Sequence, residues 1–262
     1  MLRGLSHTQS MGRFDDDICL VTGGARGIPR AIADALLAEG GRVIIVDREI
    51  KELIDHGYGS NLAVIQANVG EADLASLQSE ISAKFGTPNR LILGSAFSTE
   101  NSISEVEEED LERAWRSNIS HPLLITRDIF NALESQGRPG SAVFISSLHD
   151  RFVRGLVEYS ATKAALRMVI KELADFYAPS SIRVNGIAPG AVVEDHSNLA
   201  QQDIDLFPLG RPGSPADLTE AGLFLLDDAA SGYVTGTVID IDGGLALHSW
   251  WDKKSRQNRP LS

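Results

Sequence analysis

Residues Ile18–Ile28 have the sequence ICLVTGGARGI, an apolar run that leads into a glycine-rich turn. The apolar run predicts a short buried strand over Ile18–Thr22. Apolar residues at helical spacing follow over Ile28–Glu39, and the pair Gly40–Gly41 predicts the end of that helix. Because the strand passes through glycines directly into a helix, free backbone N–H groups and the positive end of the helix dipole meet at the turn. Such a turn can hold a pyrophosphate.

Strand-like and helix-like segments alternate along the rest of the chain. The strand-like segments are continuous apolar runs, which is typical of strands buried on both faces of a parallel sheet. We therefore expect an α/β fold, a Rossmann-like doubly wound parallel sheet with helices on both faces. Further strands are expected over Arg42–Asp47, Ala63–Ala67, Arg90–Gly94, Ser141–Ser146, Ser181–Ile187 and Thr237–Ile241, and further helices over Glu71–Phe85, Glu107–Leu133, Val157–Tyr177 and Pro215–Leu226.

The domain organisation follows from the even spacing of these segments. No internal repeat, low-complexity tract or linker interrupts them, so we expect a single domain over residues 14–247. A flexible extension is expected over residues 1–13, and the change of composition after Leu247 predicts an appended tail over residues 248–262.

Composition narrows the classes of function. Hydrophobic residues make up 43% and charged residues 23% of the 262 residues, which is ordinary for a globular protein. The single cysteine, Cys19, excludes an internal disulfide and a cysteine-based zinc module, and it suits a reducing, cytoplasmic compartment. The six histidines form no metal motif, so no metal is expected. The net charge of −12 disfavours nucleic acid and anionic membranes as partners, and no apolar run is long enough for a membrane span.

Asp47 is the candidate for cofactor selection. It ends the strand predicted over Arg42–Asp47, where a carboxylate can accept hydrogen bonds from both hydroxyls of an adenosine ribose. The same carboxylate would repel a 2′-phosphate, so it favours NAD over NADP. Arg26 and Arg48 lie nearby in the sequence and could weaken this discrimination. The alternative is that Asp47 simply caps the next turn.

A tyrosine and a lysine four residues apart form the candidate catalytic pair. Tyr159 and Lys163 share one face of a predicted helix because of their spacing. A phenol is a weak base at neutral pH, but a neighbouring ammonium stabilises the phenolate and lowers the pKa of the tyrosine. The strand predicted to end at Ser146 brings Ser146 and Ser147 to the same region, and a serine hydroxyl there can bind a substrate oxygen.

These residues resemble the short-chain dehydrogenase/reductase family over roughly residues 14–247. The family's TGxxxGxG turn is matched by Thr22, Gly23 and Gly27, whereas its last glycine is Pro29. The acid-valine pair after the third strand becomes Asn68-Val69. The family's NNAG motif becomes Gly94-Ser95-Ala96-Phe97, in which only Ala96 is retained and Phe97 replaces a glycine.

The resemblance implies a catalytic set. Asn118 matches the family's helix asparagine, which holds a water that links Lys163 to solvent. The family's serine usually lies thirteen positions before the tyrosine, as Ser146 does, but the surrounding sequence aligns better with Ser147. The implied catalytic residues are Asn118, Ser147, Tyr159 and Lys163, with Ser146 in reserve, and Lys163 is also expected to bond the nicotinamide ribose.

The resemblance also implies a nicotinamide site after the sixth strand. Pro189-Gly190 matches a turn beside the nicotinamide, and the backbone N–H of Val192 can hold the carboxamide where the family often has a threonine and this chain has Glu194. The implied cofactor residues are Thr22, Gly23, Arg26, Gly27, Ile28, Asp47, Asn68, Val69, Ala96, Tyr159, Lys163, Pro189, Gly190 and Val192.

We expect an NAD-dependent oxidoreductase that interconverts a secondary alcohol and its ketone, with Tyr159 as general base and acid. Ser147, His149 and Tyr159 are expected to face the substrate. Polar residues in Ala191–Leu209 favour a polar substrate such as a sugar, polyol or small cyclic alcohol. Two alternatives are a non-catalytic nucleotide-binding or regulatory protein on the same fold and an NADP-linked acyl-chain ketoreductase, which Asp47 disfavours. The resemblance implies a homo-oligomer, most simply a tetramer, with contacts through the helices over Glu107–Leu133 and Val157–Tyr177.

Overall fold

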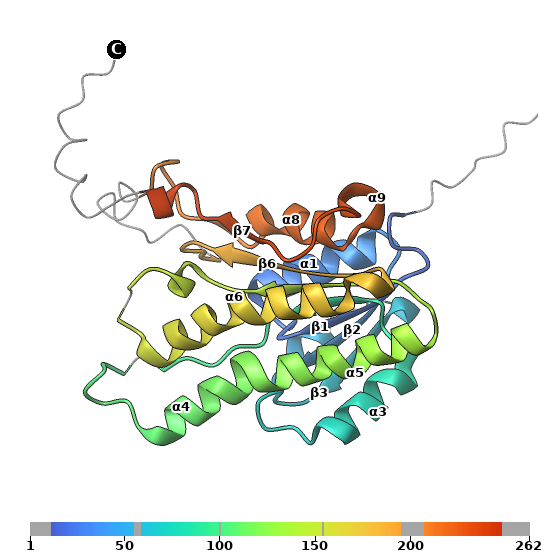
Figure 1. The fold of residues 1–262 in the computed structure, drawn as a ribbon, viewed down its shortest axis with the longest axis horizontal. Coiled ribbons are helices and arrows are strands. Elements are labelled where there is room, and N and C mark those ends of the chain that lie inside the picture. The colour runs from blue at the N-terminus through green and yellow to red at the C-terminus, as the bar shows by residue number, and fades with distance from the viewer. Residues whose placement is uncertain (1–11, 55–58, 100, 154, 195–206, 248–262) are drawn as a thin grey trace, which may run out of the picture.

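The computed structural model describes residues 12–54, 59–99, 101–153, 155–194 and 207–247. The expected tail over residues 248–262, and the extension up to residue 11, lie outside these residues. A seven-stranded parallel sheet in the order β3-β2-β1-β4-β5-β6-β7 forms the centre of the single domain (Figure 1). The strands are β1 (Ile18–Thr22), β2 (Arg42–Asp47), β3 (Leu62–Gln66), β4 (Arg90–Leu93), β5 (Gly140–Ile145), β6 (Ile182–Pro189) and β7 (Val238–Ile241).

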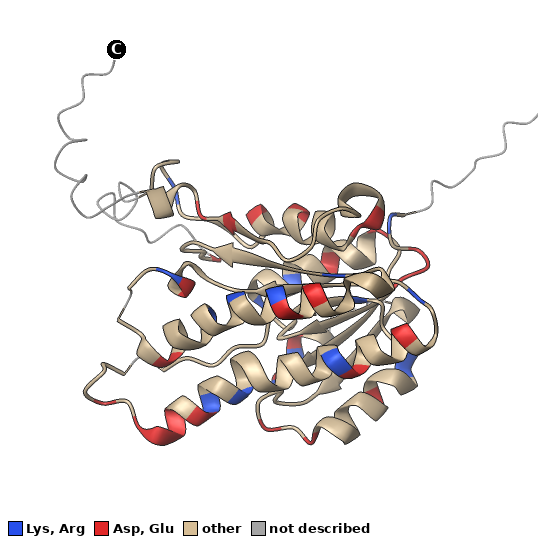
Figure 2. Cartoon of the chain, in the orientation of Figure 1, with Lys and Arg blue, Asp and Glu red and all other residues tan. Residues whose placement is uncertain are grey.

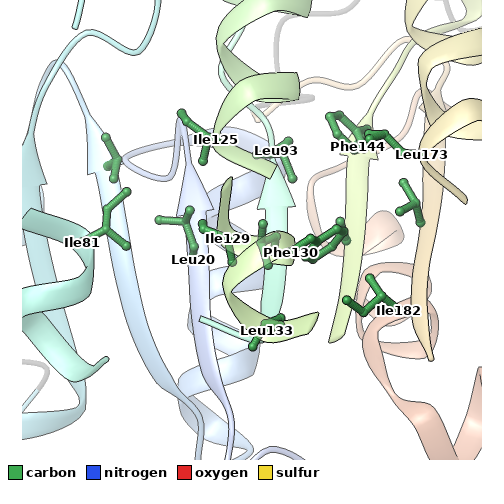
Figure 3. Close-up of a cluster of buried hydrophobic side chains, with 14 of the residues drawn as sticks. Leu20, Ile81, Leu93, Ile125, Ile129, Phe130, Leu133, Phe144, Leu173 and Ile182 are labelled. Atoms are coloured by element: carbon green, nitrogen blue, oxygen red, sulfur yellow. The ribbon is translucent and has the colours of Figure 1, made fainter. Parts of the chain in front are cut away.

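Helices cover both faces of the sheet. The helices are α1 (Gly27–Ala38), α2 (Lys51–Ile54), α3 (Leu74–Phe85), α4 (Glu108–Trp115), α5 (His121–Ser135), α6 (Val157–Tyr177), α8 (Ala216–Leu226) and α9 (Asp228–Ser231). Alternate residues of β1 enter two separate cores, since Leu20 packs with α3, α5 and α6 whereas Val21 packs with α1 and α8. Figure 3 shows Ile129, Phe130 and Leu133 of α5 against the first of these cores. The expected doubly wound α/β fold is confirmed.

The strand order places a crevice at one end of the sheet. The chain moves outward from β1 to β3 and then crosses back, so that β4 pairs with β1 on its other side. Loops that follow β1 and β4 therefore leave in opposite directions. Ligands of open α/β sheets bind at such a switch point, beside the carboxyl ends of the strands.

The sequence predicts a single helix over Glu107–Leu133, and this is wrong in one respect. The structure has α4 and α5 joined by a π-helical turn over Arg116–Ser120, in which the N–H of His121 bonds the carbonyl of Arg116. Pro122 follows directly, and a proline has no N–H to bond the carbonyl four residues earlier. That carbonyl belongs to Asn118, so the turn widens at the residue that the sequence singles out for catalysis.

Capping residues set the other helix ends. The helix expected from Glu71 begins at Leu74, because the Asp73 side chain accepts a hydrogen bond from the N–H of Ser76 at 2.9 Å. Acidic residues gather at the start of α4 (Figure 2), where Glu107 and Asp110 form a capping box. The remaining strand and helix ends fall within a few residues of those predicted.

Candidate functional site

The glycine-rich turn between β1 and α1 has the backbone that the sequence predicts. Gly23 has a φ of +70° and donates its N–H to the carbonyl of Val46 at 2.8 Å, and a Cβ there would lie 2.8 Å from the nitrogen of Ser95. Gly27 has a φ of +63° and opens α1. The helix has no side-chain cap from Arg26 and no acid in its first turn, so its N–H groups can receive an anion.

Asp47 holds this turn and also begins the next one. Its Oδ2 accepts the N–H of Ala25 at 3.0 Å, and its Oδ1 accepts the N–H of Glu49 at 3.1 Å. The half-buried carboxylate has further acceptor capacity beyond these two bonds. The sequence left open whether Asp47 caps the next turn or is available to a cofactor. In the structure it caps that turn and still has free acceptor capacity.

A cavity of about 240 Å³ opens at the carboxyl ends of the first four strands. It contains six of the residues expected to bind cofactor, namely Gly23, Arg26, Asp47, Asn68, Val69 and Ala96. The buried hydroxyl oxygen of Ser95 also borders it and has no hydrogen-bond partner among the described residues. The glycine-rich turn at the start of α1 can receive a phosphate, the Asp47 carboxylate can accept ribose hydroxyls, and the Ser95 hydroxyl can bond a ligand. Together these groups fit the adenosine end of a dinucleotide.

Three guanidinium groups border the same cavity, from Arg26, Arg48 and Arg113. The Arg113 guanidinium lies 4.3 Å from the centre of the Phe97 ring, so both side chains form one wall. Arg113 and Ser117 line the cavity but were not predicted from the sequence. They lie four residues apart, which places them on one face of a helix, and Ser117 immediately precedes Asn118, so this spacing could have identified them.

Two departures from the family motifs compensate for one another. Pro29 takes the place of a motif glycine, and Gly94 takes the place of a motif asparagine. A Cβ on Gly94 would lie 2.3 Å from the Cγ of Pro29, so the glycine provides the room that the proline ring fills. Thr22, expected to bind cofactor, is buried, and its hydroxyl accepts the N–H groups of Gly94 and Ser95 at 3.2 and 3.4 Å.

The candidate catalytic groups meet at the end of β5. The Ser147 side chain acts on the phenol of Tyr159 in the direction that lowers its pKa, and the Lys163 Nζ lies 5.3 Å from the centre of the Tyr159 ring. Lys163 donates to the carbonyl of Ile145 at 2.7 Å. Ser146 points elsewhere, because its hydroxyl bonds Asp150 at 3.3 Å. The geometry thus places Ser147, and not Ser146, beside the tyrosine.

Burial dominates the electrostatics of this pair. It raises the pKa of Tyr159 above its ordinary value, and the hydrogen bond from Ser147 opposes this with a smaller effect. The direction is opposite to the lowering expected from Lys163, because the enclosed phenolate loses hydration. Burial also lowers the pKa of Lys163 to about 8, while the Asp150 carboxylate acts in the raising direction.

The Asn118 side chain is held by hydrogen bonds to Phe97 and Thr162. Its Oδ1 accepts the N–H of Phe97 at 2.7 Å, and its Nδ2 donates to the Phe97 carbonyl and to the Thr162 hydroxyl, both at 2.9 Å. The buried side chain therefore joins the loop after β4 to α6.

The remaining expected residues lie around this cluster. The His149 ring packs edge-on against Tyr159 at 5.1 Å, and its Nδ1 lies 3.1 Å from the Ser160 hydroxyl. A Cβ on Gly190, which follows Pro189 at the end of β6, would lie 2.7 Å from the Cα of Asp242, so only glycine fits that turn.

Val192 forms a bridge to Gly213, and the half-buried Ile28 lies in the first turn of α1. The bridge uses the carbonyl of Ala191 and the N–H of Val193, which leaves the N–H of Val192 outside it. Residues 195–206, in the segment expected to cover the substrate, lie outside the described residues.

The described part of the chain holds neither a metal-binding cluster nor a membrane-spanning helix. No group of three or more His, Cys, Asp or Glu side chains there is arranged to hold a metal ion. None of the described helices has the length and apolarity needed to cross a membrane.

Comparison with known proteins agrees with the fold and the motifs. A family model described as enoyl-(acyl carrier protein) reductase matches residues 23–246. The 3-oxoacyl-[acyl-carrier-protein] reductase of Bos taurus is 33% identical over 239 residues, which cover 88% of this chain and 99% of that protein. The corresponding reductase FabG of Escherichia coli strain K12 is 30% identical, over 89% of this chain and 99% of its own.

Solved structures give the same assignment. A short-chain dehydrogenase from Leptospira borgpetersenii with bound NAD+ has a TM-score of 0.80 and 28% identity, over 88% of this chain and 93% of that one. A gluconate 5-dehydrogenase from Burkholderia cenocepacia in complex with NADP and tartrate has a TM-score of 0.79 and 26% identity, over 90% and 98%. The motifs, the doubly wound sheet and these matches together show that the chain belongs to the short-chain dehydrogenase/reductase family of oxidoreductases.

Proposed function

We propose that the protein is an NAD-dependent oxidoreductase that interconverts a secondary alcohol and its ketone. The observation that carries this proposal is the cluster of Ser147, Tyr159 and Lys163. This cluster lies at the carboxyl end of the parallel strands, as does the cavity proposed to hold the dinucleotide. A bound nicotinamide dinucleotide would supply the hydride acceptor or donor. Gly23, Arg26, Gly27, Asp47, Asn68 and Val69 would hold its adenosine and pyrophosphate, and Gly190 and Val192 its nicotinamide.

The protein's own groups handle the proton. In the oxidative direction the Tyr159 oxygen takes the proton of the substrate hydroxyl, and in the reductive direction it returns a proton to the ketone oxygen. The Ser147 hydroxyl binds that same substrate oxygen and orients it toward Tyr159. The Lys163 ammonium favours the phenolate in the oxidative direction and retains its charge below its pKa of about 8.

Asp47 supports the preference for NAD. Its carboxylate borders the cavity with acceptor capacity left over, which suits two ribose hydroxyls and disfavours a phosphate. Arg26 and Arg48 border the same cavity, so the discrimination against NADP is expected to be moderate and not absolute.

The substrate is proposed to be small and polar, such as a sugar, polyol or small cyclic alcohol. The polar segment after Gly190 and the edge-on His149 beside Tyr159 support this class. The second candidate is a 3-oxoacyl thioester, because relatives up to 33% identical are reductases of that name. Oxidation of a secondary alcohol of the first class yields a ketone, and reduction of a 3-oxoacyl thioester yields a secondary alcohol, so the same proton transfer in opposite directions serves either.

A substrate screen tests the proposal. Polyols, aldoses and sugar acids are offered with NAD and NADP, and ketoses and 3-oxoacyl thioesters with the reduced cofactors, while the absorbance of reduced nicotinamide is followed. Turnover of the polar alcohols by the wild type, and its absence in Tyr159→Phe, supports the proposal. Binding of NADH without turnover of any class supports the non-catalytic alternative instead, and turnover of thioesters alone supports the second candidate.

The assembly is proposed to be a homotetramer. The adjacent helices α4 and α6 expose large apolar side chains, including Trp115, Met168 and Phe176. A monomer seldom exposes several such side chains on neighbouring helices, so this surface is suited to a second copy of the chain.

A further inference from the structure

A buried carboxylate that the proposed reaction does not use lies three residues after Ser147. We propose that Asp150 is a positioning residue that locks the turn carrying Ser147 to the helix carrying Tyr159 and Lys163, and that serves as the counter-charge of Lys163. This inference rests on the proposed function, because it concerns how the same catalytic cluster is held and charged.

Asp150 is bonded to the candidate catalytic serine and to the serine that precedes it. Its N–H donates to the carbonyl of Ser147 at 3.0 Å, which closes the short turn over Leu148–Asp150. Its Oδ2 accepts the hydroxyl of Ser146 at 3.3 Å. Asp150 therefore holds the backbone of Ser147 and the side chain of Ser146.

Arg167 connects this turn to α6. It lies four residues after Lys163, one helical turn along the same helix, and its Nε donates to the Asp150 Oδ2 at 2.8 Å. Its Nη2 lies 2.7 Å from the same oxygen. The Asp150 side chain is completely buried, and a buried carboxylate is stable only when it is paired. The pair therefore fixes the distance between the serine turn and the helix that carries Tyr159 and Lys163.

A second pair of charges lies outside the first. Asp240 of β7 lies 3.6 Å from the Arg167 Nη2 and forms an ion pair with Arg151, whose Nε lies 3.8 Å from the Asp150 Oδ1. The groups facing Asp150 are thus Arg151 from its own turn, Arg167 and Lys163 from α6, and Asp240 from β7. The Asp242 carboxylate also acts on Arg151 and belongs to the same cluster of charges.

The charge of Asp150 matters because Lys163 is enclosed. Burial lowers the pKa of Lys163 to about 8, and Asp150 is the carboxylate that acts in the raising direction. If Asp150 is neutralised, burial acts unopposed and the lysine loses its proton at a lower pH. The neutral lysine no longer stabilises the phenolate of Tyr159, so activity that depends on the ammonium declines at a lower pH as well.

Asp150→Asn tests the proposal, because it removes the charge and keeps the shape. Asp17→Asn is the matched control, since Asp17 is also buried and pairs with Arg90 at 3.2 Å, but at the opposite end of the sheet. Arg167→Lys keeps the positive charge and loses the guanidinium bonds. The three variants are compared with the wild type by NMR titration of Lys163 in lysine-labelled protein, by thermal unfolding, and by the dependence of kcat and KM on pH.

The proposal predicts that Asp150→Asn moves the Lys163 titration to lower pH by about half a unit or more and lowers kcat by about tenfold or more. Arg167→Lys is expected to lower kcat with a smaller change in the titration. Asp17→Asn is expected to reduce thermal stability and to change neither the Lys163 titration nor kcat.

Unchanged titration and kcat in Asp150→Asn overturn the proposal. If Asp150→Asn does not fold, Arg167→Lys decides, because it keeps the positive charge beside Asp150 and loses the guanidinium bonds that join the serine turn to α6. An unchanged kcat in that variant then overturns the positioning role. A wild type inactive on every substrate contradicts the proposed function, whereas the NMR titration still decides the role of Asp150.

Discussion

Asp47 is the residue on which the proposed preference for NAD depends. Removing its side chain by Asp47→Ala deletes both the carboxylate proposed to bind the ribose and the bonds to Ala25 and Glu49. We expect kcat/KM for NAD to decrease by about tenfold or more and the ratio of NAD to NADP to move toward equality. The measurement is kcat/KM with each cofactor, and Glu49→Ala is the control, since only the backbone of Glu49 bonds Asp47. A wild type that prefers NADP would contradict this prediction.

The two adjacent serines are expected to differ in their contribution to rate. Ser147 acts on the phenol of Tyr159, whereas Ser146 bonds Asp150. Ser147→Ala is expected to lower kcat by about 100-fold because the substrate oxygen loses a hydrogen-bond donor. Ser146→Ala is expected to cause a smaller loss, measured in the same assay. Equal losses in the two variants would show that the hydroxyl beside Tyr159 has no special role.

At the scale of the elements, the junction of β1, α1 and β4 combines two unusual residues. A methyl group on Gly94 would meet the ring of Pro29, so Gly94→Ala is expected to destabilise this junction by about 1–3 kcal/mol and to weaken NADH binding. Adding Pro29→Gly removes the ring and is expected to recover part of both losses. Thermal unfolding and NADH titration of the two single variants and the double variant measure this coupling, and strictly additive effects would contradict it.

The sequence predicts the elements well where a local rule determines them. Continuous apolar runs such as Ile18–Thr22 can be strands only if both faces are buried, and the structure has this strand with the predicted ends. The π-helical turn at Asn118 was not predicted, because periodicity alone does not show how a proline changes the bond four residues earlier.

The same limit applies to the site. Motif spacing predicts Gly23, Asp47 and Tyr159, since each lies at a fixed offset within one strand, turn or helix. Arg167 and Asp240 were not found, because their approach to Asp150 depends on how separate elements pack. Long-range ion pairs leave no periodic pattern in the sequence.

At the scale of the whole molecule, the exposed faces of α4 and α6 predict assembly. Light scattering at micromolar concentration is expected to give about four times the chain mass of 28.2 kDa. Replacing Met168 and Trp115 by Asp is expected to yield smaller species, because both side chains are about half exposed in the single chain. Tyr233→Asp is the control, since Tyr233 is fully exposed and lies on neither helix. A wild-type mass of about 28 kDa would contradict the assembly.

The proposed reaction needs both cofactor binding and proton transfer. The variant Tyr159→Phe is expected to impair proton transfer and to leave cofactor binding intact. The substitution removes only the phenol oxygen, and the dinucleotide cavity is lined by other residues. On the best substrate of the screen, kcat/KM of Tyr159→Phe is the decisive measurement, with NADH affinity determined on the same preparation. We expect a decrease of about 100-fold or more with NADH affinity within about twofold of the wild type. Activity of Tyr159→Phe equal to that of the wild type would contradict the assignment of Tyr159 as the acid and base.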